Sequence, residues 1–197
     1  MKGHQSPDVS QTLNKLVNNY EFNTILDIGC GRCNHTNFFK NHGKNVTSTD
    51  LAALEPGVIA GDYMKLKFDQ HDAVWCSHVL EHQLNVQEFL HKLISECKEG
   101  GVIAITVPPL KHQIVGGHIS FWNTGLLLYR MILAGLDCSE ARVGTYGYNC
   151  SVIVSKKSIE MPQDLTYGNG DIEKLSKYFP MAVKQGFNGQ NVNVRWK

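Results

Sequence analysis

The sequence predicts an α/β fold: a three-layer, doubly wound sheet that is mostly parallel, with one antiparallel strand in a hairpin at its edge. Three observations support this prediction. Short apolar runs alternate with segments of helical periodicity, the pattern of a parallel sheet with helices on both faces. Glycine turns separate several of these segments. The last two apolar runs flank Gly147-Tyr148-Asn149, a spacing that predicts a hairpin.

The first part of the chain supplies four of the expected strands. A helix is expected after Pro7-Asp8, because apolar residues recur there at helical spacing, at Val9, Leu13, Leu16, Val17 and Tyr20. Apolar or β-branched runs then predict strands at residues 23–29, 45–50, 54–60 and 72–77. A segment with two phenylalanines predicts a helix at residues 36–42.

The second part continues the alternation. A helix with an apolar face from Val86 to Cys97 is expected to end at Gly100-Gly101. A buried strand at 102–107 follows, and Pro108-Pro109 stops it. We further expect a very apolar helix at 125–134, the hairpin strands at 141–146 and 150–155, and a short helix at 171–178. Residues 1–197 are predicted to form one domain, with a core at about 20–156 and a C-terminal extension at 157–197.

Composition excludes several classes of protein. With 42% hydrophobic and 19% charged residues, the chain is typical of globular proteins. The net charge is +1 without a run of Lys and Arg, which does not favour nucleic acid as a partner. No apolar run has the length of a membrane span, and the polar start at residues 1–7 does not resemble a signal peptide. We therefore expect a cytoplasmic protein.

The densest functional signal is the turn Leu26-Asp27-Ile28-Gly29-Cys30-Gly31, at the end of the first strand. Glycines there permit a tight turn and close approach of a ligand to the backbone. A dinucleotide fingerprint would need a third glycine where the chain has Asn34, and no Walker lysine is present. The turn therefore favours a ligand other than a dinucleotide or a nucleoside triphosphate.

Three acidic residues stand at or just after the carboxyl ends of predicted strands, at the edge where such sheets bind ligands. The Asp27 carboxylate can accept hydrogen bonds from an ammonium group. Asp50, twenty-three positions later, is placed to accept from both hydroxyls of a ribose. Asp62, after Gly61, is placed to accept from an adenine amino group. The ligand that these acids fit has an amine, a ribose and an adenine, and carries no phosphate.

The chain resembles the class I S-adenosylmethionine-dependent methyltransferases from about residue 20 to 156. Four segments carry the resemblance: residues 25–31, Thr49-Asp50-Leu51, Gly61-Asp62-Tyr63 and residues 72–82. It implies a seven-stranded sheet with one antiparallel strand and S-adenosylmethionine as the cofactor. The implied cofactor contacts are Asp27, Gly29, Cys30, Gly31, Asp50, Leu51, Asp62, Tyr63, Ser77 and His78. One departure is Cys33, which stands where the family commonly has a further glycine.

Structural roles are open for the same residues. Asp50 could be a helix cap or a turn residue, and Asp62 could be a turn residue. His78, Glu81 and His82 could cap or orient the helix that follows them. Cys30 and Cys33 form a Cys-x-x-Cys pair, but the sequence offers neither a thioredoxin-like context nor a second ligand pair. We therefore predict reduced thiols and no metal site.

His118 and His82 are the candidate catalytic residues. His118 follows Gly116-Gly117 in the crossover after the fifth strand, where the methyltransferases that the chain resembles often place acceptor-binding groups. A hydroxyl acceptor would need a general base, and an imidazole can serve as one. A loop histidine bonded to a backbone carbonyl is the structural alternative. The apolar helix at 126–133 fits burial under the C-terminal residues, an acceptor pocket or the contact of a homodimer.

The predicted function is biosynthetic methyl transfer from S-adenosylmethionine to a small molecule or to a sugar hydroxyl of a glycan. Two alternatives stay open at this point. One is a catalytically silent subunit that binds S-adenosylmethionine. The other is a nicotinamide-dependent oxidoreductase, which Asn34 in place of the third glycine opposes.

Overall fold

The computed structural model describes residues 8–196. The polar start at residues 1–7, from which no signal peptide was predicted, lies outside the described residues. The strands of the sheet are β1 (Thr24–Ile28), β2 (Asn45–Asp50), β3 (Ile59–Ala60), β4 (His71–Ser77), β5 (Cys97–Val107), β6 (Arg142–Tyr146) and β7 (Asn149–Ser155). The helices are α1 (Ser10–Asn19), α2 (Asn34–Asn41), α3 (Val86–Ser95), α4 (Thr124–Leu133) and α5 (Asp171–Leu175), with 3₁₀ turns η1 (Leu80–His82) and η2 (Ser176–Tyr178).

All seven strands form one sheet in the order β3-β2-β1-β4-β5-β7-β6. The pairs from β3 to β5 are parallel, and β7 runs antiparallel to both of its neighbours. The predicted fold class is therefore confirmed, including the single antiparallel strand. Strand order reverses between β1 and β4, so the ligand crevice of such a sheet is expected beyond the carboxyl ends of these two strands.

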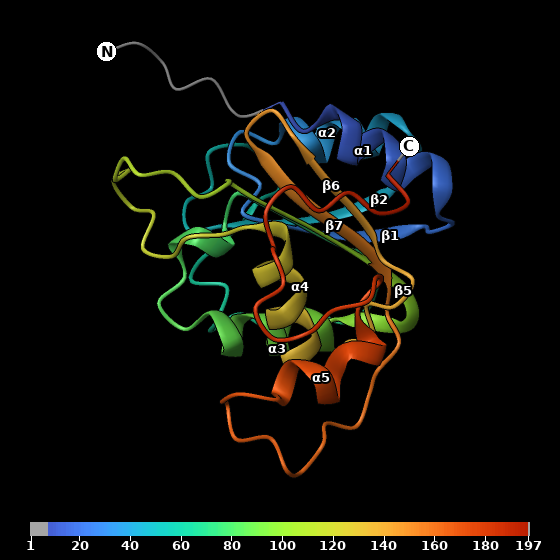
Figure 1. The fold of residues 1–197 in the computed structure, drawn as a ribbon. Coiled ribbons are helices and arrows are strands. Elements are labelled where there is room, and N and C mark those ends of the chain that lie inside the picture. The colour runs from blue at the N-terminus through green and yellow to red at the C-terminus, as the bar shows by residue number, and fades with distance from the viewer. Residues whose placement is uncertain (1–7, 197) are drawn as a thin grey trace.

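Two apolar cores lie on opposite faces of the sheet (Figure 1). Side chains alternate along a strand, so that Ile25 of β1 packs with α1 and α2, and the adjacent Leu26 belongs to the core under α3 and α4. Both side chains are fully buried. The three-layer arrangement thus follows from continuous apolar runs in the central strands.

The C-terminal residues cover α4. The Thr124 hydroxyl donates to the Gly189 carbonyl at 3.1 Å, and Phe187 and Phe179 pack against the core that α4 shares. A Cβ atom on Gly125 would lie 2.5 Å from the Cα of Gly189. Of the three roles considered for this helix, burial under the C-terminal residues is the one that these contacts match.

Two predicted elements were wrong in their bounds. The helix expected to reach Cys97 ends at Ser95, and β5 begins at Cys97, so that Gly100 and Gly101 lie inside a strand. Gly101 is required there because its Cβ would lie 2.6 Å from the Asp72 carbonyl oxygen, where β4 and β5 shift register.

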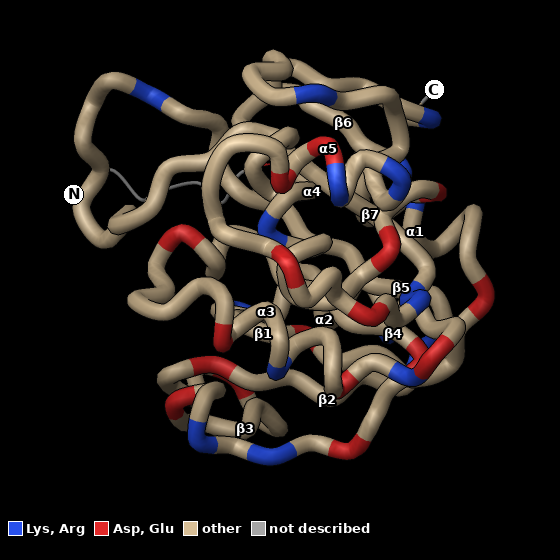
Figure 2. The backbone as a smooth tube through the Cα atoms, turned by 60° about the horizontal axis from the view of Figure 1, so that its bottom comes forward, with Lys and Arg blue, Asp and Glu red and all other residues tan. Residues whose placement is uncertain are grey.

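The third strand is also shorter than predicted. Only Ile59 and Ala60 pair with β2, because Pro56 cannot donate to a ladder and Gly57 adopts a φ of 85°. Among residues 8–196, no helix is long and apolar enough to cross a membrane. Figure 2 shows basic and acidic positions interspersed along the backbone rather than gathered on one side.

Candidate active site

The glycine turn after β1 closes over the end of β2. Gly29, with a φ of 74°, and Cys30 both donate backbone hydrogen bonds to the Thr49 carbonyl, at 2.8 and 3.1 Å. The Gly31 amide donates to Asp50 Oδ2 at 2.8 Å. Asp50 therefore links the two strand ends directly, a role that sequence reasoning missed when it considered a ribose contact, a helix cap or a turn residue.

Asp27 lies buried beneath this turn. Its Oδ2 accepts from the Thr36 hydroxyl at 2.6 Å, whereas its Oδ1 accepts no hydrogen bond from the described residues. Burial, and to a lesser degree the charge of Asp50, raises the pKa of Asp27 to about 7. A buried carboxylate with an open acceptor position suits a ligand ammonium group, which would stabilise the ionised form.

A cavity of about 340 Å³ opens at the carboxyl ends of β1, β2 and β4. Among the residues predicted to bind cofactor, those that line it are Gly29, Asp50, Leu51, Asp62, Tyr63 and His78. The volume is in the range of pockets that hold drug-sized ligands. Asp27, the first of the residues predicted to bind cofactor, does not line the cavity but immediately precedes Ile28 and Gly29, which do.

Other predicted cofactor residues lie beside this cavity rather than on its surface. Cys30 and Ser77 are buried, and neither they nor Gly31 line it. Burial also raises the pKa of the Cys30 thiol. Cys30 and Cys33 both carry free thiols, and their sulfur atoms lie 3.9 Å apart. Their contribution is to the shape of the turn, in which Cys33 adopts a φ of 59° where the family commonly has glycine.

Asp62 and Tyr63 make local contacts as well as lining the cavity. Asp62 Oδ1 accepts from the Met64 amide at 3.0 Å, which is the turn role considered from the sequence. The Tyr63 hydroxyl donates to the buried Glu96, and burial raises the pKa of Tyr63. The hydroxyl of Tyr63 is thereby committed to the core, so its ring, not its hydroxyl, faces a ligand.

A cluster of histidines around Glu81 adjoins the cavity. His82 and His118, predicted from separate segments, lie with their ring centroids 5.0 Å apart. His82 Nδ1 donates to the Gly117 carbonyl at 2.7 Å, and His78 Nδ1 lies 3.4 Å from the fully buried Glu81 carboxylate. The two candidate catalytic residues therefore meet at one place, beside the cofactor-side cavity.

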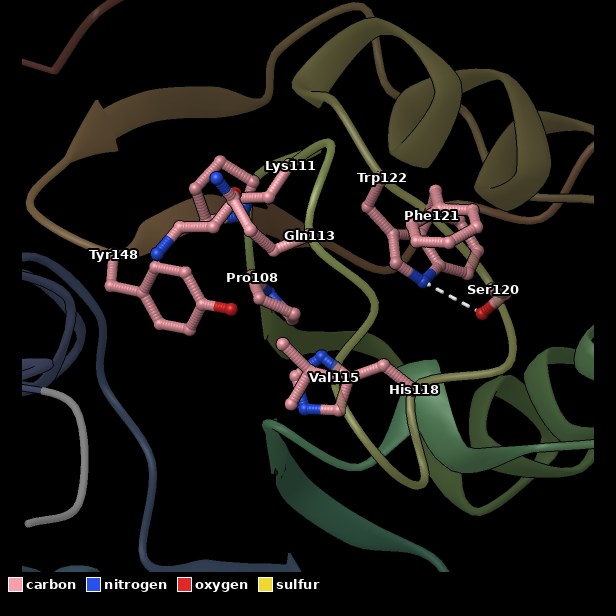
Figure 3. Close-up of a pocket in the computed structure, with 10 residues that line it drawn as sticks. Pro108, Lys111, Gln113, Val115, His118, Ser120, Phe121, Trp122 and Tyr148 are labelled. Atoms are coloured by element: carbon pink, nitrogen blue, oxygen red, sulfur yellow. Dashed lines mark hydrogen bonds between the residues drawn. The ribbon is translucent and has the colours of Figure 1, made fainter. Parts of the chain in front are cut away.

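A second pocket lies on the other side of His118 (Figure 3). Sequence reasoning missed its aromatic walls, Phe121, Trp122 and Tyr148, because Tyr148 comes from the β6–β7 hairpin. Lys111 Nζ lies 4.1 Å from the centroid of the Tyr148 ring. The enclosed space is only about 10 Å³, room for one water, so a larger molecule can bind only if the loop of residues 108–122 shifts.

Comparison with known proteins identifies the class to which this fold and site belong. A family model described as a methyltransferase domain matches residues 1–135. The chain belongs to this methyltransferase family, its fold is that of the class I S-adenosylmethionine-dependent enzymes, and its cofactor is S-adenosylmethionine.

Particular relatives are more distant. The ubiquinone biosynthesis O-methyltransferase of Rickettsia bellii (strain OSU 85-389) is 33% identical over 97 residues, covering 42% of this chain and 40% of the relative. The chain thus matches well under half of that relative's length.

Two solved structures share the fold. A SAM-dependent methyltransferase from Archaeoglobus fulgidus aligns with a TM-score of 0.60 at 18% identity, over 69% of this chain and 86% of that one. The 1,6-didemethyltoxoflavin-N1-methyltransferase of Burkholderia thailandensis, solved with its substrate and S-adenosylhomocysteine, aligns with a TM-score of 0.57 at 18% identity, over 68% and 71%.

Proposed function

We propose that the protein transfers the methyl group of S-adenosylmethionine to an oxygen of a small, partly apolar molecule. The observation that supports this proposal most strongly is the position of His82 and His118 between two pockets. His82 lines the cavity at the glycine turn, and His118 lines the aromatic pocket of residues 108–122. A group that bridges two bound molecules can take a proton from one while the other reacts.

The chain's residues contribute alignment and proton removal. When bound, S-adenosylmethionine supplies an electrophilic methyl group on a sulfonium. Asp27 and Asp50 are proposed to hold the amine and the ribose of the cofactor, which fixes the direction in which the second pocket meets it. His82 Nε2 is available as the base, because Nδ1 carries the proton that the Gly117 carbonyl accepts.

The loop supports an apolar acceptor over a sugar. Several of its side chains are apolar yet exposed: Leu110, Ile114, Ile119 and Phe121. Apolar side chains that gather on an exposed surface often mark a site that binds a ligand or a partner. The Rickettsia relative is named an O-methyltransferase of ubiquinone biosynthesis, which also favours an oxygen acceptor with apolar character. A sugar hydroxyl is the second candidate acceptor. We also propose that the protein is cytoplasmic and has a single catalytic domain.

The test combines binding with turnover. Calorimetry should show S-adenosylhomocysteine binding at micromolar concentrations, about −8 kcal/mol. Methyl transfer is then assayed with hydroxylated apolar compounds and with sugars. His118→Ala and His82→Gln should lower kcat by about 10²-fold or more with little change in S-adenosylhomocysteine affinity. Intact binding with no turnover on either panel would favour the silent-subunit alternative.

A further inference from the structure

The cluster between the two pockets contains a carboxylate and two imidazoles at metal-ligand spacing. One donor atom from each of Glu81, His82 and His118 lies within 4.8 Å of the others. To reach zinc–ligand distances of about 2.0–2.2 Å, these atoms would have to draw closer together by side-chain rotation. Glu81 and His82 belong to η1, and His118 belongs to the loop that faces it.

Glu81 lacks the hydrogen bonds that a buried anion requires. Its side chain is 0% exposed, and neither carboxylate oxygen accepts a hydrogen bond from the described residues. The imidazole nitrogens flanking it, His78 Nδ1 at 3.4 Å and His82 Nε2 at 3.9 Å, are beyond the usual 2.7–2.9 Å of a charge-assisted hydrogen bond. Such a carboxylate needs a cation close to it.

The hydrogen bonds of His82 fix which of its nitrogens faces Glu81. Nδ1 lies 2.7 Å from the Gly117 carbonyl oxygen, which can only accept. Nδ1 therefore carries a proton, so in the neutral form of the ring the lone pair belongs to Nε2, the nitrogen on the side of Glu81. Metal-binding histidines commonly donate their other nitrogen to a backbone carbonyl in this way.

His78 repeats the pattern on the other side of Glu81. Its Nε2 lies 2.9 Å from Asn149 Oδ1, and the Asn149 amide nitrogen donates to the Asp8 carbonyl at 2.8 Å, which fixes the amide orientation. His78 Nε2 therefore carries a proton, so in the neutral form of the ring the lone pair belongs to Nδ1, which lies on the side of Glu81. In their neutral forms the two rings would thus turn a lone pair each toward the buried carboxylate of Glu81.

We propose that Glu81, His82 and His118 bind a divalent cation of the zinc class. Imidazole and carboxylate are ligands that zinc accepts, and three protein ligands leave a fourth position open. The cation would compensate the buried carboxylate and the lone pairs turned toward it at once. His78 flanks the site and helps to orient Glu81.

The role of this cation rests on the proposed function. The three residues lie at the junction of the two pockets, where the acceptor oxygen is proposed to lie, so a cation that they hold would be close to that oxygen. A bound cation would hold that oxygen and lower its pKa, so that deprotonation would no longer depend on a histidine base. In the metal-free protein, His82 and His118 remain the groups able to take the proton.

The experiment titrates chelator-treated full-length protein with Zn²⁺ alone, in calorimetry without cofactor. We expect one Zn²⁺ per chain, with Mg²⁺ binding far more weakly. His118→Ala and Glu81→Gln should each weaken zinc binding at least about tenfold. His112→Ala is the matched control, because His112 is an exposed histidine of the same loop, outside the cluster. It should bind zinc as the wild type does.

A thermal melt with and without Zn²⁺ adds a readout that does not depend on activity. Zinc should raise the melting temperature of the wild type and of the control, and not that of His118→Ala. Asp50→Ala should lose S-adenosylhomocysteine binding and keep zinc binding, which separates the two proposals. Wild-type protein that binds S-adenosylhomocysteine without binding zinc would overturn the metal site and leave the proposed function standing. Equal loss in His112→Ala would overturn it as well.

Discussion

At the residue scale, Asp27 is the group that we expect to make cofactor binding depend on pH. Its pKa is raised to about 7, chiefly because the carboxyl is buried. An acid whose pKa is raised on folding binds more protons folded than unfolded, so its ionisation lowers stability as pH rises from about 4 to 7. A ligand ammonium beside Asp27 would favour the ionised form and reverse this cost in the complex.

We therefore expect S-adenosylhomocysteine affinity to rise as pH increases from 6 to 8. The gain should approach about tenfold for each pH unit below the pKa of Asp27. Calorimetry at several pH values measures it. Asp27→Asn should bind weakly at every pH and lose most of the dependence, because the titrating carboxyl is gone. A variant that keeps the full slope would place the titration elsewhere, with the histidines around Glu81 as the next groups to test.

At the scale of elements, the glycine turn is held by two different constraints. Gly29 and Gly31 both have positive φ, at 74° and 52°. A Cβ on Gly29 would lie 2.2 Å from Val79 Cγ2, whereas a Cβ on Gly31 would meet nothing within 4 Å. A side chain at Gly31 would thus meet only backbone strain, whereas one at Gly29 would meet both backbone strain and a steric clash.

Gly29→Ala should therefore destabilise the protein more than Gly31→Ala. Gly31→Ala should cost only the strain of a left-handed residue, about 1–2 kcal/mol. Gly29→Ala adds the collision with Val79, and combining it with Val79→Ala should recover part of the loss. Denaturant melts of the two glycine variants, the double variant, Val79→Ala alone and the wild type measure these differences. Equal losses in the two single variants would mean that Val79 yields without cost.

Pattern alone located most elements, and the failures have a common cause. The strand at 45–50 was bounded correctly because it is short, follows the turn at Gly43 and ends where the chain bends at Leu51. Gly100-Gly101 was mistaken for a helix end because local sequence cannot show that Asp72 approaches Gly101 across the sheet. The acids at the ends of β1 and β2 were expected to be neighbours, since parallel strands end at one edge. Tyr148 was not expected beside the loop of residues 108–122, since only the pairing of β7 with β5 brings the hairpin there.

At the scale of the whole molecule, the residues after β7 complete the core over α4. The Gly125 amide donates to the Gly189 carbonyl at 2.9 Å, and the close approach there leaves no space for a side chain. A second attachment lies at β6, where a Cβ on Gly144 would lie 2.1 Å from the Trp196 ring. The C-terminal residues are therefore part of the packed structure and not an appendage.

Gly125→Ala should displace this segment. We expect a loss of about 1–3 kcal/mol in unfolding free energy, typical of overpacking, and faster proteolysis within residues 180–196. Gly116→Ala is the control, because its Cβ would meet nothing within 4 Å and its φ is not in the left-handed region. Mass spectrometry of the fragments identifies the cleavage sites. Unchanged melting and digestion of Gly125→Ala would show that the segment shifts freely.

Asn149 joins parts of the molecule that are distant in sequence. Its side chain spans from the Asp8 carbonyl to His78, which in turn flanks Glu81. In mechanical terms, this amide is a rigid link between the Asp8 backbone and the site. A displacement of the Asp8 backbone would therefore reach the orientation of His78 through two hydrogen bonds. If the protein is attached to a surface through an exposed side chain of α1, the attachment does not pull directly on this link.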